Sequence, residues 1–235
     1  MPKQADALDK VLSASQAILF DFDGPICDVF SHLPAPSVAA ELASLLAALA
    51  PALEDSARTT DDPMKVHRLS WEGGSAALAA VEAALTAAEI RAVKVAGAPT
   101  KGAVESLHAA NEAGRRVAVV SNNSAECVRK YLSLHGIAGV VDEVIGRPAL
   151  RPDLMKPSPH PLLTAAAAFS IPPGFTVLIG DSVSDIEAAH AAGARSLGYA
   201  NKPRKQVALE QAGADVVVLS MHRVAEALGH PLVEQ

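Results

Sequence analysis

Two carboxylates lie two residues apart in the segment Asp21-Phe22-Asp23-Gly24, directly after a short apolar run. At that spacing both acids can point into one site. One can attack phosphorus as a nucleophile while the other handles the proton of the leaving group. The same carboxylates offer oxygen ligands to a hard cation, and Gly24 allows the backbone to turn sharply. Alone, the segment also fits an acidic surface turn, so its interpretation depends on the rest of the chain.

Two further segments carry groups suited to an anion. Ser121-Asn122-Asn123 offers a hydroxyl followed by backbone amides at a helix start, which can hold a phosphate oxygen. Lys156, held next to Pro157, can neutralise phosphate charge and steady a nucleophile. Taken singly, these are also compatible with a helix cap and a surface lysine.

A second pair of acids occurs in Gly180-Asp181-Ser182-Val183-Ser184-Asp185. Asp181 ends a predicted strand, and Asp185 falls in the first turn of the helix that follows. Unpaired like charges repel, so a divalent cation is a natural reason to gather them. Asp185 alone is also explained as a helix N-terminal acid.

The elements that must position these groups are short apolar runs separated by helical stretches. Such runs are typical of buried strands, and they span 17–20, 116–120, 140–145, 176–179, 195–197 and 215–219. The helical stretches span 99–113, 124–135, 159–170, 184–192 and 203–212, with Ser124 as an N-cap. This alternation predicts an α/β fold, a Rossmann-like three-layer α/β/α parallel sheet, whose ligands bind beyond the carboxyl ends of the strands.

One segment breaks the alternation. Between the first two strands the sequence has helical patterns at 38–49 and 75–88, separated by a polar stretch at 51–74 that Pro63, Gly73 and Gly74 interrupt. We therefore expect an inserted α-helical cap domain at 27–98, with the catalytic core formed by 1–26 and 99–235.

Bulk composition excludes several classes of function. The net charge is −6, and the densest basic group is Lys202, Arg204 and Lys205, which we interpret as a solvated helix start. Nucleic-acid binding needs a denser positive face, so we expect no nucleic-acid partner. No apolar run is long enough for a membrane span, and residues 1–16 contain no apolar signal core. Together with only two cysteines, Cys27 and Cys127, this predicts a cytoplasmic protein.

Jointly, these segments resemble the haloacid dehalogenase superfamily of phosphohydrolases, in particular its phosphoglycolate-phosphatase-like branch, which carries a helical cap at this point of the chain. The matching segments are Ile18–Gly24, Val119–Asn122, Lys156-Pro157 and Ile179–Asp185. The resemblance covers nearly all of the chain outside the insert. It implies a magnesium-dependent phosphatase that hydrolyses a small phosphorylated metabolite through an aspartyl-phosphate intermediate.

The resemblance also implies a role for each matching residue. Asp21 would be the nucleophile, and Asp23 would protonate the leaving oxygen and then activate water. Ser121, Asn122 and Lys156 would bind the phosphate. The residues implied at the Mg²⁺ site are Asp21, Asp23 through its backbone carbonyl, Asp181 and Asp185, the last supporting either the metal or Lys156. The chain departs from the family at Pro25, where the family often has Thr, and this puts local hydrogen bonding in doubt.

The predicted cap would lie over the strand ends and close on the substrate. Lys65 and Arg68 are candidates to meet a substrate anion, and Trp71 is a candidate to cover an apolar part. For each of them taken singly, an ordinary surface or helix-capping role is the interpretation that we prefer. The oligomeric state and the physiological substrate stay open.

Several rival functions use similar residues. A phosphomutase of the β-phosphoglucomutase type would return the phosphoryl group to a sugar hydroxyl, and a phosphonoacetaldehyde hydrolase would need a cap lysine, for which Lys65 is a candidate. A dehalogenase usually lacks the second acid that Asp23 provides. A non-catalytic binding protein on the same fold usually lacks one of the acids retained here.

Overall fold

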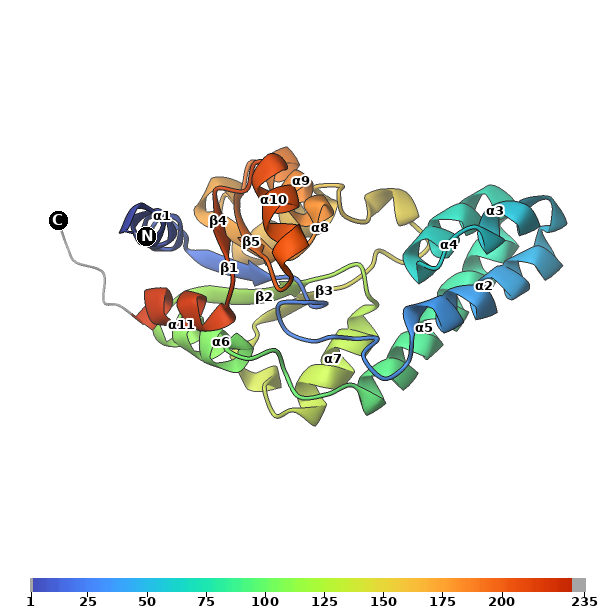
Figure 1. Cartoon of the computed structure of the whole chain (residues 1–235), viewed down its shortest axis with the longest axis horizontal. Coiled ribbons are helices and arrows are strands. Elements are labelled where there is room, and N and C mark those ends of the chain that lie inside the picture. The colour runs from blue at the N-terminus through green and yellow to red at the C-terminus, as the bar shows by residue number, and fades with distance from the viewer. Residues whose placement is uncertain (1, 230–235) are drawn as a thin grey trace.

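A six-stranded parallel sheet forms the centre of the molecule (Figure 1) in the computed structural model, which describes residues 2–229 and the side chains of residues 6–229. The strand order is β3-β2-β1-β4-β5-β6. Their bounds are β1 Ala17–Phe20, β2 Arg116–Val120, β3 Glu143–Ile145, β4 Thr176–Gly180, β5 Arg195–Tyr199 and β6 Val216–Val218. The predicted α/β fold is confirmed.

Helices cover both faces of this sheet because alternate strand residues point to opposite sides. Ile18 and Phe20 pack into one apolar cluster with helices α1, α6, α7 and α11, whereas Ala17 and Leu19 pack into another with α8 and α9. Helix α10 packs on the second side through Leu209. The bounds are α1 Pro2–Ser13, α6 Ala103–Glu112, α7 Ala125–Leu134, α8 His160–Phe169, α9 Val183–Ala192, α10 Pro203–Gln211 and α11 Met221–Gly229.

Within the connection from β1 to β2, residues 35–95 are mainly helical and extend to one side of the sheet (Figure 1). Its helices are α2 Ala35–Leu49, α3 Glu54–Arg58, α4 Pro63–Ser70 and α5 Gly74–Val95, with short 3₁₀ turns at Pro51–Leu53 and Trp71–Gly73. This insert has an apolar cluster of its own, whose larger buried residues include Val38, Leu42, Leu46, Val81 and Leu85. The helical character of the insert agrees with the sequence, whereas the boundaries at 27 and 98 stay a prediction.

The polar stretch at 51–74 holds more structure than the sequence pattern indicated, since it contains α3 and α4. Helix α4 forms there because Asp62 accepts a hydrogen bond from the backbone N–H of Met64 at 2.9 Å and Pro63 occupies the first helical position. Asp62 and Pro63, which lie in the stretch that interrupts the predicted helices, are thus helix-starting residues.

Other boundaries also differ from the prediction. The helix expected from residue 99 begins at Ala103, because Gly102 adopts the left-handed region at φ +86° just before it. The strand expected over 140–145 is only Glu143–Ile145, and 138–140 is a 3₁₀ turn. Helices α1 and α11 were not predicted. From the sequence we also expect the tail after Gly229 to fray, and that tail lies outside the described residues.

Candidate active site

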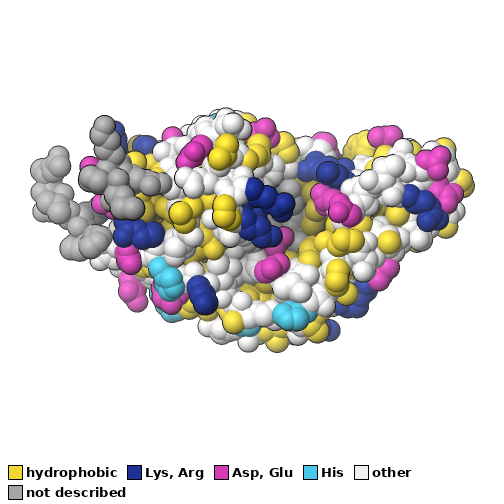
Figure 2. All heavy atoms as spheres, viewed as in Figure 1, with side chains coloured by type: hydrophobic (Ala, Val, Ile, Leu, Met, Phe, Trp, Pro, Cys, Tyr) yellow, Lys and Arg dark blue, Asp and Glu magenta, His cyan; other side chains and the backbone are white. Residues whose placement is uncertain are grey.

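The carboxyl ends of three neighbouring strands carry the polar residues singled out from the sequence. Asp21 follows β1, Ser121 follows β2, and Asp181 follows β4. Because β1 lies between β2 and β4, these residues meet at one edge of the sheet, where the strand order reverses direction and ligands of such sheets bind. Figure 2 shows that the molecule is hollowed between this core and the helical insert, with basic and acidic side chains at the rim.

Lys156 lies at the centre of the site and is almost completely buried. Its Nζ is 2.8 Å from Oδ1 of Asp21 and 2.6 Å from Oδ1 of Asp185, and it donates to the carbonyl of Val120 at 3.0 Å. Burial by itself lowers the pKa of this ammonium, but the two carboxylates outweigh burial and raise the pKa. Lys156 is therefore a permanent positive charge beside the Asp21 carboxylate.

Three carboxylates gather around this point. Asp21, Asp181 and Asp185 each place an oxygen within 4.8 Å of the others. Burial, followed by the nearby charge of Asp185, holds the pKa of Asp21 well above its usual range. Burial likewise raises the pKa of Asp181, although Lys205 opposes this rise. Each shift reflects mainly the cost of burying a carboxylate, to which the neighbouring carboxylates add.

The donor set fits a hard divalent cation. Mg²⁺ is bound through carboxylate oxygens and keeps several water ligands, so it needs only one or two protein carboxylates. Asp21 and Asp181 meet this requirement, with Asp185 close enough to take part.

Asp185 is held in place by the start of helix α9. Its Oδ2 accepts hydrogen bonds from the backbone N–H of Ser182 at 3.0 Å and from the Ser182 hydroxyl at 2.6 Å. This is a capping box, which fixes the carboxylate relative to the helix. Its second oxygen, Oδ1, contacts Lys156. One side chain thus both completes a helix cap and contacts Lys156.

Asp23 lies beside the acidic cluster but outside it. Its Oδ1 accepts a hydrogen bond from the backbone N–H of Val29 at 3.0 Å. Burial raises the pKa of Asp23 to about 6, with the Val29 bond opposing the rise. A carboxyl with such a pKa exchanges a proton near neutral pH, as a general acid and base requires. Among the described residues, the gathered carboxylates are those of Asp21, Asp181 and Asp185, and the side chain of Asp23 is not one of them.

Gly24 lets the segment after β1 lie close to Asp181, which follows β4. It adopts φ +103°, and a Cβ there would lie 2.2 Å from Oδ2 of Asp181. Only glycine fits such a position without displacing the carboxylate. The carbonyl of Gly24 accepts a hydrogen bond from the Thr100 hydroxyl at 2.8 Å. Thr100 therefore supplies a hydroxyl next to the segment in which Pro25 provides none.

Ser121 and Asn122 begin the segment that leads from β2 to helix α7. The Ser121 hydroxyl donates to Oδ1 of Asn123 at 3.2 Å and accepts from its backbone N–H at 3.1 Å. The Asn122 side chain spans the backbone of Lys156, accepting from its N–H at 2.9 Å and donating to its carbonyl at 3.1 Å. Asn122 thus joins the two elements that carry the predicted phosphate-binding groups.

Two contacts of Asp181 were missed at the level of sequence. Asn201 donates to Oδ2 of Asp181 at 3.1 Å, and the Lys205 ammonium also contacts that oxygen. We interpreted Lys205 as part of a solvated trio, but it is only partly exposed and belongs to the site. One feature of the sequence could have indicated this contact. Lys205 lies in the first turn of the helix after β5, and β5 is the neighbour of β4, the strand that leads to Asp181.

The cap candidates differ in their surroundings. Arg68 of α4 donates to the carbonyl of Pro152 at 3.0 Å and to that of Lys156 at 2.6 Å, so it links the insert to the Lys156 segment. Lys65 and Trp71 are exposed. The structure brings together Asp21, Lys156, Asp181 and Asp185, and it does not bring Lys65 or Trp71 into that cluster.

The sequence of this chain is similar to those of known hydrolases. The haloacid dehalogenase-like hydrolase profile matches residues 16–193. A phosphoglycolate phosphatase of Psychrobacter arcticus is 29% identical over 78% of this chain and 82% of its own length. One from Haemophilus influenzae is 36% identical over 40% of this chain and 41% of its own length. In four such relatives the match covers between 40% and 50% of the relative's length, so the chain spans about half of them.

Solved structures share the fold. A predicted phosphoglycolate phosphatase from Haemophilus somnus superposes with a TM-score of 0.63 at 21% identity, covering 91% of this chain and 97% of the other. At that identity the likeness establishes the fold alone. Within the described part of the chain, no helix is long and apolar enough to cross a membrane.

Proposed function

This chain belongs to the haloacid dehalogenase-like hydrolase family, and we propose that it is a magnesium-dependent phosphatase that releases phosphate from a small phosphorylated metabolite. The observation that carries the proposal is the contact of the buried Lys156 ammonium with both Asp21 and Asp185, beside the cluster that Asp181 completes. The phosphoglycolate phosphatases among its relatives support the substrate class. The two described cysteines are free and buried, in keeping with our expectation of a cytoplasmic protein.

In the first step a carboxylate oxygen of Asp21 attacks phosphorus, and the bond between phosphorus and the leaving oxygen breaks. Asp23 gives its proton to that oxygen, so the product alcohol leaves neutral. The burial that raises the pKa of Asp23 to about 6 keeps a share of this carboxyl protonated near neutral pH. Lys156 balances the charge that gathers on the transferring group.

In the second step the Asp23 carboxylate takes a proton from a water molecule, which attacks phosphorus of the aspartyl-phosphate. The bond between phosphorus and Asp21 breaks, which releases phosphate and restores both carboxyl groups. Asp21 and Asp181, with Asp185 and the backbone carbonyl of Asp23, would hold Mg²⁺, which when bound supplies Lewis-acid neutralisation of the phosphoryl oxygens.

The test is phosphate release from a panel of phosphorylated metabolites, measured with Mg²⁺ and with chelator for the wild type and Asp21→Asn. We expect Mg²⁺-dependent release that the variant loses. Isomerised sugar phosphate without net release would instead identify a mutase, and wild-type rates in Asp21→Asn would refute the nucleophile assignment.

A further inference from the structure

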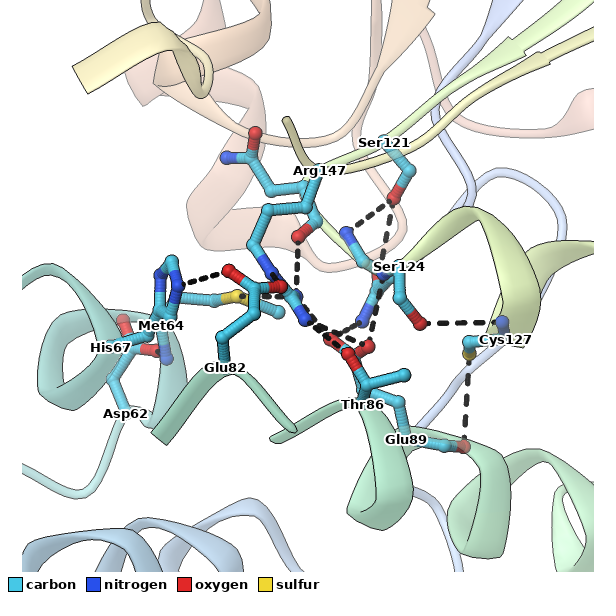
Figure 3. Close-up of polar contacts among 12 residues, drawn as sticks. Asp62, Met64, His67, Glu82, Thr86, Glu89, Ser121, Ser124, Cys127 and Arg147 are labelled. Carbon is cyan, nitrogen blue, oxygen red and sulfur yellow. Dashed lines mark hydrogen bonds and ion pairs between the residues drawn. The ribbon is translucent and has the colours of Figure 1, made fainter. Parts of the chain in front are cut away.

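A buried group of charges joins helix α5 of the insert to the segment after β2 (Figure 3). Arg147, two residues beyond β3, has a fully buried side chain. Its Nε lies 2.7 Å from Oε1 of Glu82, and its Nη1 lies 2.7 Å from Oε1 of Glu89. Glu82 in turn contacts Nε2 of His67 at 2.6 Å, which extends the group to α4. None of these residues contributes to the chemistry proposed above.

The Glu89–Arg147 pair contacts every residue that follows Ser121 up to the start of helix α7. Glu89 accepts from the backbone N–H of Ser124 at 2.9 Å and from Nδ2 of Asn123 at 3.2 Å. Arg147 donates to the carbonyl of Asn122 at 3.0 Å through Nη1, and to that of Asn123 at 2.8 Å through its backbone N–H. The pair therefore determines the path of the backbone between 122 and 124.

Through Asn123 the same pair reaches the Ser121 hydroxyl. Because Nδ2 of Asn123 donates to Glu89, its Oδ1 faces Ser121 and accepts a hydrogen bond from the Ser121 hydroxyl at 3.2 Å. The side chain of Asn122, whose carbonyl Arg147 contacts, spans the backbone of Lys156. Of the three predicted phosphate-binding residues, Asn122 contacts the buried pair directly, and Ser121 and Lys156 are each one residue removed from it.

Stability alone is a poor reason to bury such charges. Desolvation of an ion pair often cancels its Coulombic gain, and apolar residues of similar volume are often as stable. A buried pair does specify geometry, since each donor and acceptor must meet its partner. Close packing reinforces this specification: a Cβ at Gly146 would lie 2.2 Å from the backbone nitrogen of Ala125.

We propose that Glu89 and Arg147 are positioning residues that hold segment 121–124 in the geometry that binds the phosphoryl group, so that helix α5 couples the insert to phosphate recognition. The inference rests on the proposed function, because it takes Ser121 and Lys156 as the groups that bind phosphate.

The experiment compares Glu89→Gln, Arg147→Lys and Asn123→Ala with the wild type. Asn123→Ala is the most selective change, because it removes the amide between Glu89 and Ser121 and leaves the ion pair intact. Arg91→Met is the matched control, since Arg91 lies on the same helix in an exposed pair with Glu41. The readouts are KM and kcat for p-nitrophenyl phosphate, the inhibition constant of inorganic phosphate, the half-saturating Mg²⁺ concentration and the midpoint of thermal unfolding.

For the folded variants we expect KM and the phosphate inhibition constant to rise about tenfold, which corresponds to about 1.4 kcal/mol, with a smaller change in kcat. The Mg²⁺ requirement and the control should match the wild type. A purely structural role would lower the unfolding midpoint and leave both constants unchanged. Wild-type constants in folded Asn123→Ala would overturn the inference, even if the other two variants do not fold.

The outcomes also separate the two proposals. A wild type that hydrolyses p-nitrophenyl phosphate while Asn123→Ala keeps wild-type constants refutes only the positioning role. A wild type that neither hydrolyses phosphate esters nor binds inorganic phosphate in calorimetry with Mg²⁺ refutes the proposed function, and the positioning role with it.

Discussion

At the scale of single residues, Asp23 has the surroundings of a proton donor. Burial raises its pKa to about 6, and one hydrogen bond from Val29 fixes its carboxylate. A positioned general acid contributes about 100- to 10,000-fold to a rate. We therefore expect Asp23→Asn to lower kcat for an alkyl phosphate by a factor in that range. Exposed Asp28 nearby is the control, and Asp28→Asn should retain wild-type turnover. Equal kcat values for Asp23→Asn and the wild type would exclude the acid role.

Gly24 allows Asp21 and Asp181 to share one site. A side chain at φ +103° is strained by about 1–3 kcal/mol, and a Cβ would collide with the Asp181 carboxylate. Gly24→Ala should therefore raise the half-saturating Mg²⁺ concentration and lower activity, whereas Gly114→Ala, also at positive φ but in open space, should affect only stability. Magnesium titrations of activity for both variants provide the check. Unchanged Mg²⁺ dependence in Gly24→Ala would contradict this account.

At the scale of elements, helix α4 meets the core at the segment that carries Lys156. Arg68 donates two hydrogen bonds to backbone carbonyls there, and each such bond contributes about 1 kcal/mol. Arg68→Met should therefore reduce kcat/KM by about tenfold or more without altering the Mg²⁺ requirement. Arg91→Met serves again as the control. A variant with wild-type kcat/KM would show that the α4 contact does not affect turnover.

The elements that the sequence predicts well are those whose apolar runs and stop signals are local. The central strands and the N-cap at Ser124 follow from burial, strand-end polar residues and capping chemistry. The stretch at 51–74 was predicted poorly because prolines and acidic residues occur both at the starts of helices and in loops. For the same reason, Asp185 was compatible with two roles until its capping box and its contact with Lys156 were both visible.

Contacts between distant elements were not predicted. Lys205 and Asp181 meet because β4 and β5 are neighbouring strands, and Arg147 of the core meets Glu89 of helix α5 in the insert. Neither pair has a spacing that marks it in the chain, because a salt bridge between distant elements depends on tertiary packing. Arg and Glu side chains are mostly exposed in proteins, so nothing in the sequence singled out Arg147 and Glu89.

At the scale of the whole molecule, stability should depend jointly on pH and Mg²⁺. Burial raises the pKa of Asp21, Asp23 and Asp181 above their unfolded values. A carboxyl with a raised folded pKa contributes stability below its unfolded pKa of about 4, and this contribution is lost as pH rises through the folded pKa. For Asp23 this pH window runs from the ordinary carboxyl pKa of 3.8 to the raised pKa of about 6.

Mg²⁺ should restore the stability that is lost as pH rises, because metal binding competes with protons for the same carboxylates. We expect the rise in unfolding midpoint on adding Mg²⁺ to be larger at pH 7.5 than at pH 5. Asp181→Asn should remove most of that rise. An equal rise at both pH values, or in the variant, would mean that these carboxylates are not the metal site.

The covalent intermediate on Asp21 is the central claim, and it is tested most directly by trapping it. Asp23→Asn should still react once with p-nitrophenyl phosphate, because nitrophenolate leaves with little need of a proton, but it lacks the base for hydrolysis. The account predicts a burst of about one nitrophenolate per enzyme and, by mass spectrometry, a phosphoryl group on the peptide that contains Asp21. Both signals should be absent in the double variant that carries Asp21→Asn and Asp23→Asn. Steady turnover without a phosphorylated peptide, or phosphate on another residue, would contradict it.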